Sequence, residues 1–210
     1  ALYVSDFSSP IIGHAQHPMR DPHWDHDYGR IWRVIHTGKP LVEEWPIIEG
    51  ANPAQLCKLL VHPQDLVRHH ARIKLRKHGK KAIQAVDKWI MEFDSRADNF
   101  EQAMLEAIFV CEGLGEVRPL LIEKLAQSKS YFFRGAAART VRLQADRLPQ
   151  AQELLSHLAK DTHPRVLVEL INAVAHLRPN MPEIESCLDG INTKDSDVKN
   201  SLAYLEMGTK

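Results

Sequence analysis

Apolar positions recur along most of the chain at the spacing of paired helices. The pattern Arg68-x-x-Ala71-x-x-x-Leu75 returns two periods later as Arg134-x-x-Ala137-x-x-x-Val141, which gives a period of about 33 residues. The other copies are Glu101-x-x-Met104-x-x-x-Ile108 and Leu167-x-x-Leu170-x-x-x-Val174, with a looser one at Val198, Leu202 and Leu205. A helical unit of this length cannot bury its apolar face alone, so neighbouring units are expected to stack around one continuous core.

Turn signals divide this region into five predicted helix pairs. The first pair begins at the N-cap Asn52 and ends before Gly79, with a break at His62-Pro63 and with Asp65 as the cap of its second helix. The other pairs are predicted at 80–94 with 99–113, 116–127 with 130–145, 149–160 with 164–178, and 182–190 with 195–207. We therefore predict a mainly α fold, a HEAT-like α-solenoid over residues 51–210. The alternative is a plain helical bundle, which would not require a constant period.

Residues 1–50 differ from the repeats. Leu2-Tyr3-Val4 and residues 31–35 are β-branched and aromatic runs, which predict a short N-terminal pair of β-strands. A polar loop rich in proline and histidine separates them, and residues 37–52 have the glycines and prolines of a linker. Trp45, Ile47 and Ile48 are expected to clamp this linker to a neighbouring surface. Because the chain opens as a strand already under way, we expect the strand pair to be the remnant of a larger sheet in a longer protein.

The charge balance and the cysteines narrow the classes of function. The sequence has 27 basic and 27 acidic side chains, which indicates no polyanionic or membrane partner across the whole surface. No stretch approaches ~18 uninterrupted apolar residues, so no membrane insertion is predicted. Cys57, Cys111 and Cys187 are odd in number and lie among apolar helical positions, which favours reduced, buried thiols over a disulfide framework.

A histidine-rich segment is the strongest candidate for a metal site. His14, His17, His23 and His26 are interleaved with acidic residues, and neutral imidazoles oriented by carboxylates are good ligands for zinc, copper or iron. Two prolines in the segment predict an irregular loop, so the spacing does not fix the geometry. The alternative is a structural loop without a metal, in which carboxylates accept hydrogen bonds from arginines and backbone donors; its members are Arg20, Asp21, Asp25 and Arg30.

The other candidate motifs favour packing or solvation over chemistry. The helix predicted to run from Arg68 toward Lys81 is strongly basic, which is typical of a surface that binds phosphate groups. Its apolar positions already account for the inner face, however, and aromatic stacking residues are absent, so no nucleic-acid partner is predicted. No G-x-S-x-G turn, phosphate-binding glycine loop or H-E-x-x-H helix occurs, and Cys111 has no nearby base in the sequence, so no catalytic residue is predicted. The aromatic residues at helical positions are interpreted as core or inter-repeat contacts; they are Trp89, Phe93, Phe132 and Phe133.

The N-terminal segment resembles a known protein family. Its sequence is similar to the end of the β-propeller in PVC-type (planctomycete and verrucomicrobial) haem-binding or membrane-bound dehydrogenase-like proteins. The resemblance rests on the run from Ile11 to His17, on Arg20-Asp21-Pro22, on Asp25-His26 and on the run from Gly29 to Val34. In that family the propeller is like that of pyrroloquinoline quinone (PQQ) sugar dehydrogenases, and HEAT-like repeats and a cytochrome c domain with Cys-x-x-Cys-His follow it. The resemblance covers residues 1–35 by motif and 52–210 by architecture.

The resemblance implies an exported protein, periplasmic or extracellular, with this chain as the propeller end and the solenoid. The chain has no Cys-x-x-Cys-His and little of a propeller, so haem and PQQ are expected only outside it. We expect this chain alone to be no enzyme but a scaffold or protein-interaction region of a dehydrogenase-like, haem-associated protein. Its expected partner is another protein or another domain of the parent chain. The alternative function is a metal- or redox-cofactor-binding fragment that uses the loop from His14 to His26.

Overall fold

The chain folds into a mainly helical structure with a short antiparallel sheet near its start. The computed structural model describes residues 1–6, 27–38, 40 and 45–207. The chain divides into two compact units, Ala1–Trp45 and Pro46–Lys210. The boundary expected from the sequence lies near residue 50.

The N-terminal unit contains the predicted pair of strands. β1 (Leu2–Asp6) and β2 (Arg30–Val34) run antiparallel, with Val4 opposite Trp32 and Asp6 opposite Arg30. The indole Nε1 of Trp32 donates a hydrogen bond to Oδ2 of Asp6 at 3.0 Å. A two-stranded hairpin alone is only marginally stable in water. In this pair the large apolar side chains are exposed; they are Leu2, Tyr3, Val4, Ile31, Trp32 and Val34.

The helices of the second unit lie where the apolar pattern predicts them. The first four are α1 (Pro53–Leu59), α2 (Asp65–Lys77), α3 (Lys80–Glu92) and α4 (Phe100–Glu112). They are followed by α5 (Pro119–Ala126), α6 (Tyr131–Gln144) and the short η1 (Ala145–Arg147). The last are α7 (Ala151–Leu158), α8 (Pro164–Leu177), η2 (Pro182–Gly190) and α9 (Ser196–Met207).

Two details of the helix prediction are wrong. Residues 182–190 form a helix with the predicted bounds, but it is a 3₁₀-helix, η2, which buries Ile184 and Cys187. Asp65 is the first residue of α2, and the N-cap is Gln64. The carboxylate of Asp65 does not cap the helix because it accepts a hydrogen bond from Nη2 of Arg68 at 2.8 Å.

The predicted start of the first helix is confirmed. The Asn52 side chain accepts a hydrogen bond from the backbone N–H of Gln55, and the Gln55 side chain accepts one from the N–H of Asn52, each at 2.9 Å. This capping box satisfies two backbone donors that have no partner inside the helix. Prolines occupy first-turn positions of several helices, where a missing N–H has little effect; they are Pro53, Pro119, Pro164 and Pro182.

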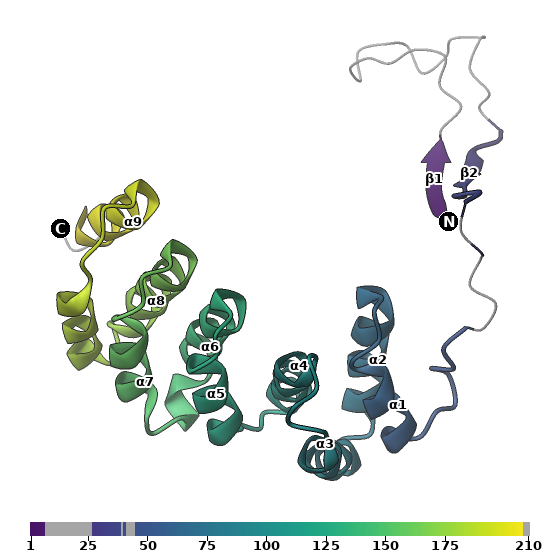
Figure 1. The fold of residues 1–210 in the computed structure, drawn as a ribbon, viewed down its shortest axis with the longest axis horizontal. Helices are drawn as coiled ribbons and strands as arrows, with labels where there is room; N and C mark the ends of the chain where they lie inside the picture. The colour runs from purple at the N-terminus through teal and green to yellow at the C-terminus, as the bar shows by residue number, and fades with distance from the viewer. Residues whose placement is uncertain (7–26, 39, 41–44, 208–210) are drawn as a thin grey trace. The chain divides into compact units, whose positions relative to one another are not determined.

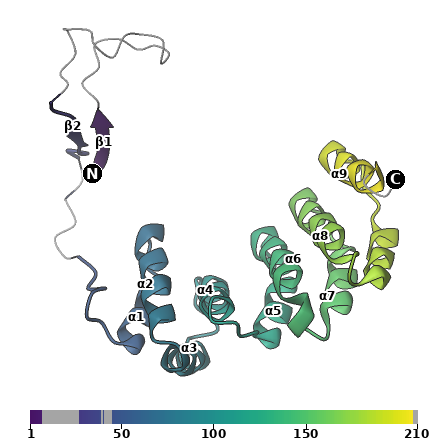
Figure 2. The ribbon, with the colours of Figure 1, turned by 180° about the vertical axis from the view of Figure 1, so that it is seen from behind.

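Within the second unit the helices lie in two rows (Figures 1 and 2). α2, α4, α6, α8 and α9 contact one another in succession, and α1, α3, α5, α7 and η2 lie on the other side, each packed against the first row. Many of the side-chain bonds between neighbouring helix pairs join residues 31 to 34 positions apart, close to the sequence period, and a smaller set joins residues 27 apart. Examples of the longer spacing are Arg72 with Glu106, Gln144 with Glu112, and Arg118 with Asp87.

The predicted apolar register supplies the core. Its members in α2, α6 and α8 are fully buried; they include Ala71, Leu75, Ala137, Val141, Leu170 and Val174. The buried residues form two clusters, and α4 contributes to both of them. The prediction that three apolar residues hold the linker against a neighbouring surface is wrong in part. Trp45 and Ile47 are exposed, while Ile48 packs against the core. The reason is that adjacent side chains of a non-helical segment point in different directions.

Candidate binding groove

The predicted metal loop lies outside the described residues. His14, His17, His23 and His26 all belong to that part of the chain, as do Arg20, Asp21 and Asp25. Arg30 is described; it begins β2 opposite Asp6 and is exposed. Among the described residues, no group of three or more histidine, cysteine, aspartate or glutamate side chains is placed to hold a metal ion. The four-histidine site and the structural loop therefore both stay predictions.

The cysteines are free and buried, as predicted. Burial raises the pKa of the Cys57 thiol to about 12, and the nearby Cys111 adds to this effect. Burial also raises the pKa of Cys111 to about 11, although the Arg118 guanidinium acts in the opposite direction. The thiolate is the nucleophilic form of cysteine, so these two thiols are unreactive at neutral pH.

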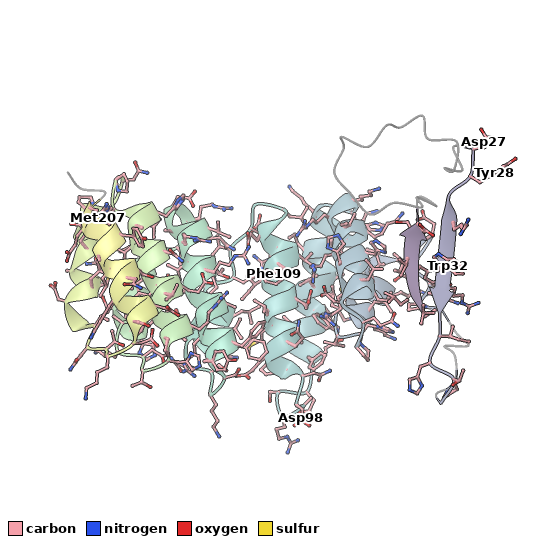
Figure 3. The ribbon with its side chains drawn as sticks, turned by 90° about the horizontal axis from the view of Figure 1, so that it is seen from above. Asp27, Tyr28, Trp32, Asp98, Phe109 and Met207 are labelled. Carbon is pink, nitrogen blue, oxygen red and sulfur yellow. The ribbon has the colours of Figure 1, made fainter. Side chains whose placement is uncertain are left out.

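A groove crosses the row of helices formed by α2, α4, α6 and the start of α8. It consists of two adjoining hollows that share Arg72, Phe109 and Arg139, and we call it the α2–α6 groove. Figure 3 views the helices from above, with Phe109 labelled on α4. The first hollow also contacts Arg68, Glu106, Phe132 and Arg165, and the second His69, Arg76 and Leu143.

A buried carboxylate forms the floor of the groove between α2 and α4. Glu106 is 1% exposed and accepts a hydrogen bond from Nη1 of Arg72 at 2.5 Å and one from Nε2 of Gln102 at 2.9 Å. Nε of Arg68 forms a second ion pair with it at 3.3 Å. A buried carboxylate is tolerated only when it is paired and hydrogen-bonded, and these contacts fulfil both conditions. The cluster therefore fixes α2 against α4.

Phe109 and two arginines form the centre of the groove. The guanidinium of Arg72 lies over the Phe109 ring, 5.8 Å from its centroid, at the distance of a cation–π contact. Nη2 of Arg76 donates a hydrogen bond to the carbonyl of Phe109 at 3.1 Å. Arg76 passes so close to Gly113 that an added Cβ would lie 2.1 Å from its Nε. Glycine at this position thus permits arginine to approach the C-terminal end of α4, where the helix dipole favours a cation.

The α6 side of the groove presents an aromatic ring and a free cation. Phe132, predicted from the sequence to be a core or inter-repeat contact, is 57% exposed and not part of the core; its neighbour Phe133 is partly buried against the core. The two consecutive residues differ because only one face of α6 meets the core. Arg139 is exposed, and none of the described residues forms an ion pair or hydrogen bond with it. Leu143, 44% exposed, continues the apolar surface by one more turn.

One polar contact below the second hollow is incomplete. Nε2 of Gln144 donates to Oε2 of Glu112 at 3.3 Å, which joins α6 to α4. Gln144 is fully buried, and its Oε1 has no hydrogen-bond partner among the described residues. A buried acceptor without a donor destabilises the folded state, so this part of the α4–α6 contact is weaker than a fully paired one.

Other charged contacts of the helical unit are ion pairs that connect neighbouring helix pairs. Arg118 forms a two-bond contact with Asp87, at 2.7 and 2.9 Å. Arg134 does the same with Asp161, at 2.5 and 3.1 Å. Such paired contacts raise the pKa of both arginines. Because the charge of each of these guanidiniums is already compensated by a carboxylate, neither is an unpaired cation for a charged ligand.

The groove resembles a protein-binding surface more than a catalytic site. Its two hollows have volumes of about 240 and 310 Å³, just below and just inside the range of about 300–1,000 Å³ that is common for small-molecule sites. Neither is lined by cysteine or serine, and the free cation, the aromatic ring and the apolar side chains provide binding contacts. A surface of this kind can accept an extended segment that runs across several helices.

The basic helix that begins near Arg68 is evident in the sequence, but this groove was not predicted from it, although two signals were present. Glu106 is the one charged residue in the apolar run from Ala103 to Cys111, which indicates a buried ion pair. Arg68, Arg72 and Arg76 are spaced four apart, so they share one face of a helix. Neither signal reveals which helix supplies the partner.

Comparisons with known proteins leave the family open. No protein-family model matches the chain, and no curated protein matches it either. Among the described residues, no helix has the length and apolar character needed to cross a membrane.

Proposed function

We propose that the helical unit is a HEAT-like α-solenoid that serves as a non-catalytic scaffold, with the α2–α6 groove as its docking surface for a protein segment. The fold part of the proposal is supported by the two rows of helices and by the side-chain bonds that recur 31 to 34 residues apart. Repeat arrays of this kind offer extended binding surfaces.

The observation that carries the docking role is the combination of an exposed aromatic ring with an unpaired cation on one surface. Phe132 and Arg139 both lie on α6 and line the same hollow. Aromatic and arginine side chains dominate the binding energy of protein interfaces.

We further propose that the chain belongs to an exported, dehydrogenase-like, haem-associated protein and that β1 and β2 come from its propeller. The sequence resemblance of residues 1–35 supports this proposal. The exposed apolar side chains of β1 and β2 support it too, because a hairpin with uncovered apolar side chains is stabilised when further strands complete its sheet. Under this proposal the protein is periplasmic or extracellular, and its haem and quinone sites lie outside the present chain.

Selection from a random peptide library tests the docking role. The full chain is immobilised, bound peptides are enriched, and their dissociation constants are measured for wild type and for Phe132→Ala. We expect the truncation to weaken the selected peptides by about tenfold or more, as for an aromatic residue at the centre of an interface. The matched control is Tyr204→Ala, since Tyr204 is 72% exposed on α9, away from the groove.

The two variants separate the possible outcomes. Circular dichroism and thermal unfolding establish that both remain folded, since neither ring is buried. Peptides that lose affinity with Phe132→Ala alone support docking in the groove. A library that yields no binders, or binders that respond equally to the two truncations, would overturn the docking role.

A further inference from the structure

We infer that the α2–α6 groove binds an acidic, extended protein segment that also carries an apolar side chain. This inference rests on the proposed docking function and deepens it by naming the chemistry of the partner. It follows from which charged side chains of the groove already have a partner of opposite charge and which do not.

The four described acidic residues that line the groove all have partners within the protein. Asp65 is exposed but paired with Arg68 at 2.8 Å, and Glu112 accepts a hydrogen bond from Gln144. Glu106 is held by Arg72 and Arg68 beneath the surface. Glu169 has only 14% of its side chain exposed and forms an ion pair with Arg165 at 2.9 Å. Because these carboxylates are committed to partners within the protein, they offer little to a basic ligand.

Two of the arginines that face solvent in the groove lack a carboxylate partner among the described residues. Arg139 makes no ion pair with any described residue, and Arg76 is bonded only to a backbone carbonyl, that of Phe109. A guanidinium has five N–H donors, so both side chains retain donors for a ligand carboxylate. They line the same hollow from α2 and from α6, so together they can bind two acidic side chains of one segment.

Apolar side chains lie between these cations. Phe109, Ile73 and Leu143 line the hollow with them, and Phe132 lines the adjoining one. A ligand with only acidic residues would leave this surface exposed to water. We therefore assign one apolar side chain of the partner to the space beside Phe109, flanked by its acidic residues.

The geometry favours an extended segment over a helix or a folded domain. Neighbouring helices pack about 10 Å apart, so the path from α2 over α4 to α6 measures roughly 20 Å, which about six extended residues span. A protein segment is favoured over a nucleic acid because only two of the described arginines that line the groove, Arg76 and Arg139, lack a carboxylate partner, whereas a nucleic acid carries a phosphate at every nucleotide. The whole chain has 27 basic and 27 acidic residues, so no long-range positive field attracts a polyanion.

The composition of the peptides selected on the wild-type protein is the first test. We expect the groove-dependent peptides to be rich in aspartate and glutamate around one apolar residue. In the tightest of them, replacement of the acidic residues by their amides should weaken binding by about tenfold or more, and added salt should weaken the parent peptide but not the amide version.

Arg139 provides the second test. Arg139→Ala should weaken the acidic peptide by about fivefold to tenfold and leave the amide version unchanged, while Arg139→Glu should instead favour a version with lysine in place of the acidic residues. Arg96→Ala is the matched control, because the Arg96 side chain is 93% exposed in the turn between α3 and α4. Binding of the acidic peptide should not change in that variant.

The outcomes distinguish this inference from the function on which it rests. Groove-dependent peptides that are neutral or basic would overturn the acidic partner but leave the docking role intact. A single-stranded oligonucleotide that binds more tightly than the acidic peptide, and loses affinity with Arg139→Ala, would replace the protein segment by a nucleic acid. If no peptide depends on Phe132, the docking role itself fails.

Discussion

Arg68 and Arg134, which occupy the same position in repeats two periods apart, make the same backbone hydrogen bonds. Nη1 of Arg68 donates to the carbonyls of His62 and Pro63, at 2.8 and 3.1 Å, six and five residues earlier in the chain. Nη1 of Arg134 donates to the carbonyls six and five residues before it, those of Ser128 and Lys129, both at 2.9 Å. Each arginine thus ties the turn before its helix to the helix itself.

The carboxylate partner of Arg134 makes stability depend on pH. Burial alone would raise the pKa of Asp161, but hydrogen bonds from Arg134 and from the N–H of His163 outweigh it and hold this pKa below its ordinary value. Since the pKa is lower in the folded state than in the unfolded chain, the carboxylate stabilises the fold above about pH 4, and this contribution is lost as pH falls through the folded-state pKa.

Replacement of the Asp161 carboxylate should therefore destabilise the folded protein only near neutral pH. We expect Asp161→Asn to lower the free energy of unfolding by about 1–3 kcal/mol near neutral pH, and the difference from wild type to shrink in acid. Urea denaturation at several pH values measures this. Asp98→Asn serves as the control, because Asp98 is exposed and its replacement should change little. An equal loss at all pH values would rule out the ion pair as the cause.

The charge cluster under the groove is expected to be sensitive to the loss of its carboxylate. Glu106→Gln leaves the guanidiniums of Arg68 and Arg72 without a counter-charge, and should cost about 2–5 kcal/mol. Glu92→Gln is the matched control, since Glu92 is exposed and pairs only with the exposed Lys88. Thermal or urea unfolding gives both values. In the double variant with Arg72→Met the cost should be less than the sum of the single changes; additivity would show that the two groups do not interact.

The recurring apolar positions that the structure buries lead to a direct prediction about core packing. Leu75 is fully buried in α2, so Leu75→Ala should lower the free energy of unfolding by about 2–5 kcal/mol through lost contacts and a residual cavity. In the same helix Leu66 is 64% exposed, and Leu66→Ala should have only a small effect. Urea denaturation distinguishes the two. A loss of less than about half a kcal/mol for Leu75→Ala would mean that the register is wrong.

The two most perturbed thiols should resist alkylation in the folded protein. The pKa of Cys57 is about 12 and that of Cys111 about 11, so both stay protonated and buried near neutral pH. Incubation with iodoacetamide followed by mass spectrometry should label neither residue in the native state, and both in urea, where a thiol has its ordinary pKa of about 8.5. Rapid labelling of either thiol without urea would contradict its burial.

The histidine-rich loop makes a prediction that is independent of the groove. If His14, His17, His23 and His26 hold a metal, the chain should bind zinc stoichiometrically, and His14→Ala with His17→Ala should abolish this binding. Isothermal titration of both proteins measures it, with His176→Ala on α8 as the control for an exposed histidine. The metal site would be excluded if wild type bound none of zinc, copper and iron in such titrations, or if binding survived the paired substitution.

The sequence by itself determined the helices and their inward faces. Asn52, the first-turn prolines and the recurring positions of Ala71, Leu75 and their counterparts are local signals, since capping and helical periodicity depend on residues a few positions apart. The equivalence of Arg68 and Arg134 is visible for the same reason, because each arginine contacts the turn just before it. The 3₁₀ form of η2 escaped prediction, since a short apolar spacing fits either kind of helix.

Only the tertiary structure decided which of these faces meet and what remains outside. Glu106, Arg72 and Arg139 come from three different helices, and their approach depends on how α2, α4 and α6 pack, which no local pattern encodes. Phe132 and Phe133 are chemically identical neighbours, yet one is exposed in the groove and the other packs against the core. The rotation of α6 about its own axis decides between them, and that rotation is set by the helices on either side.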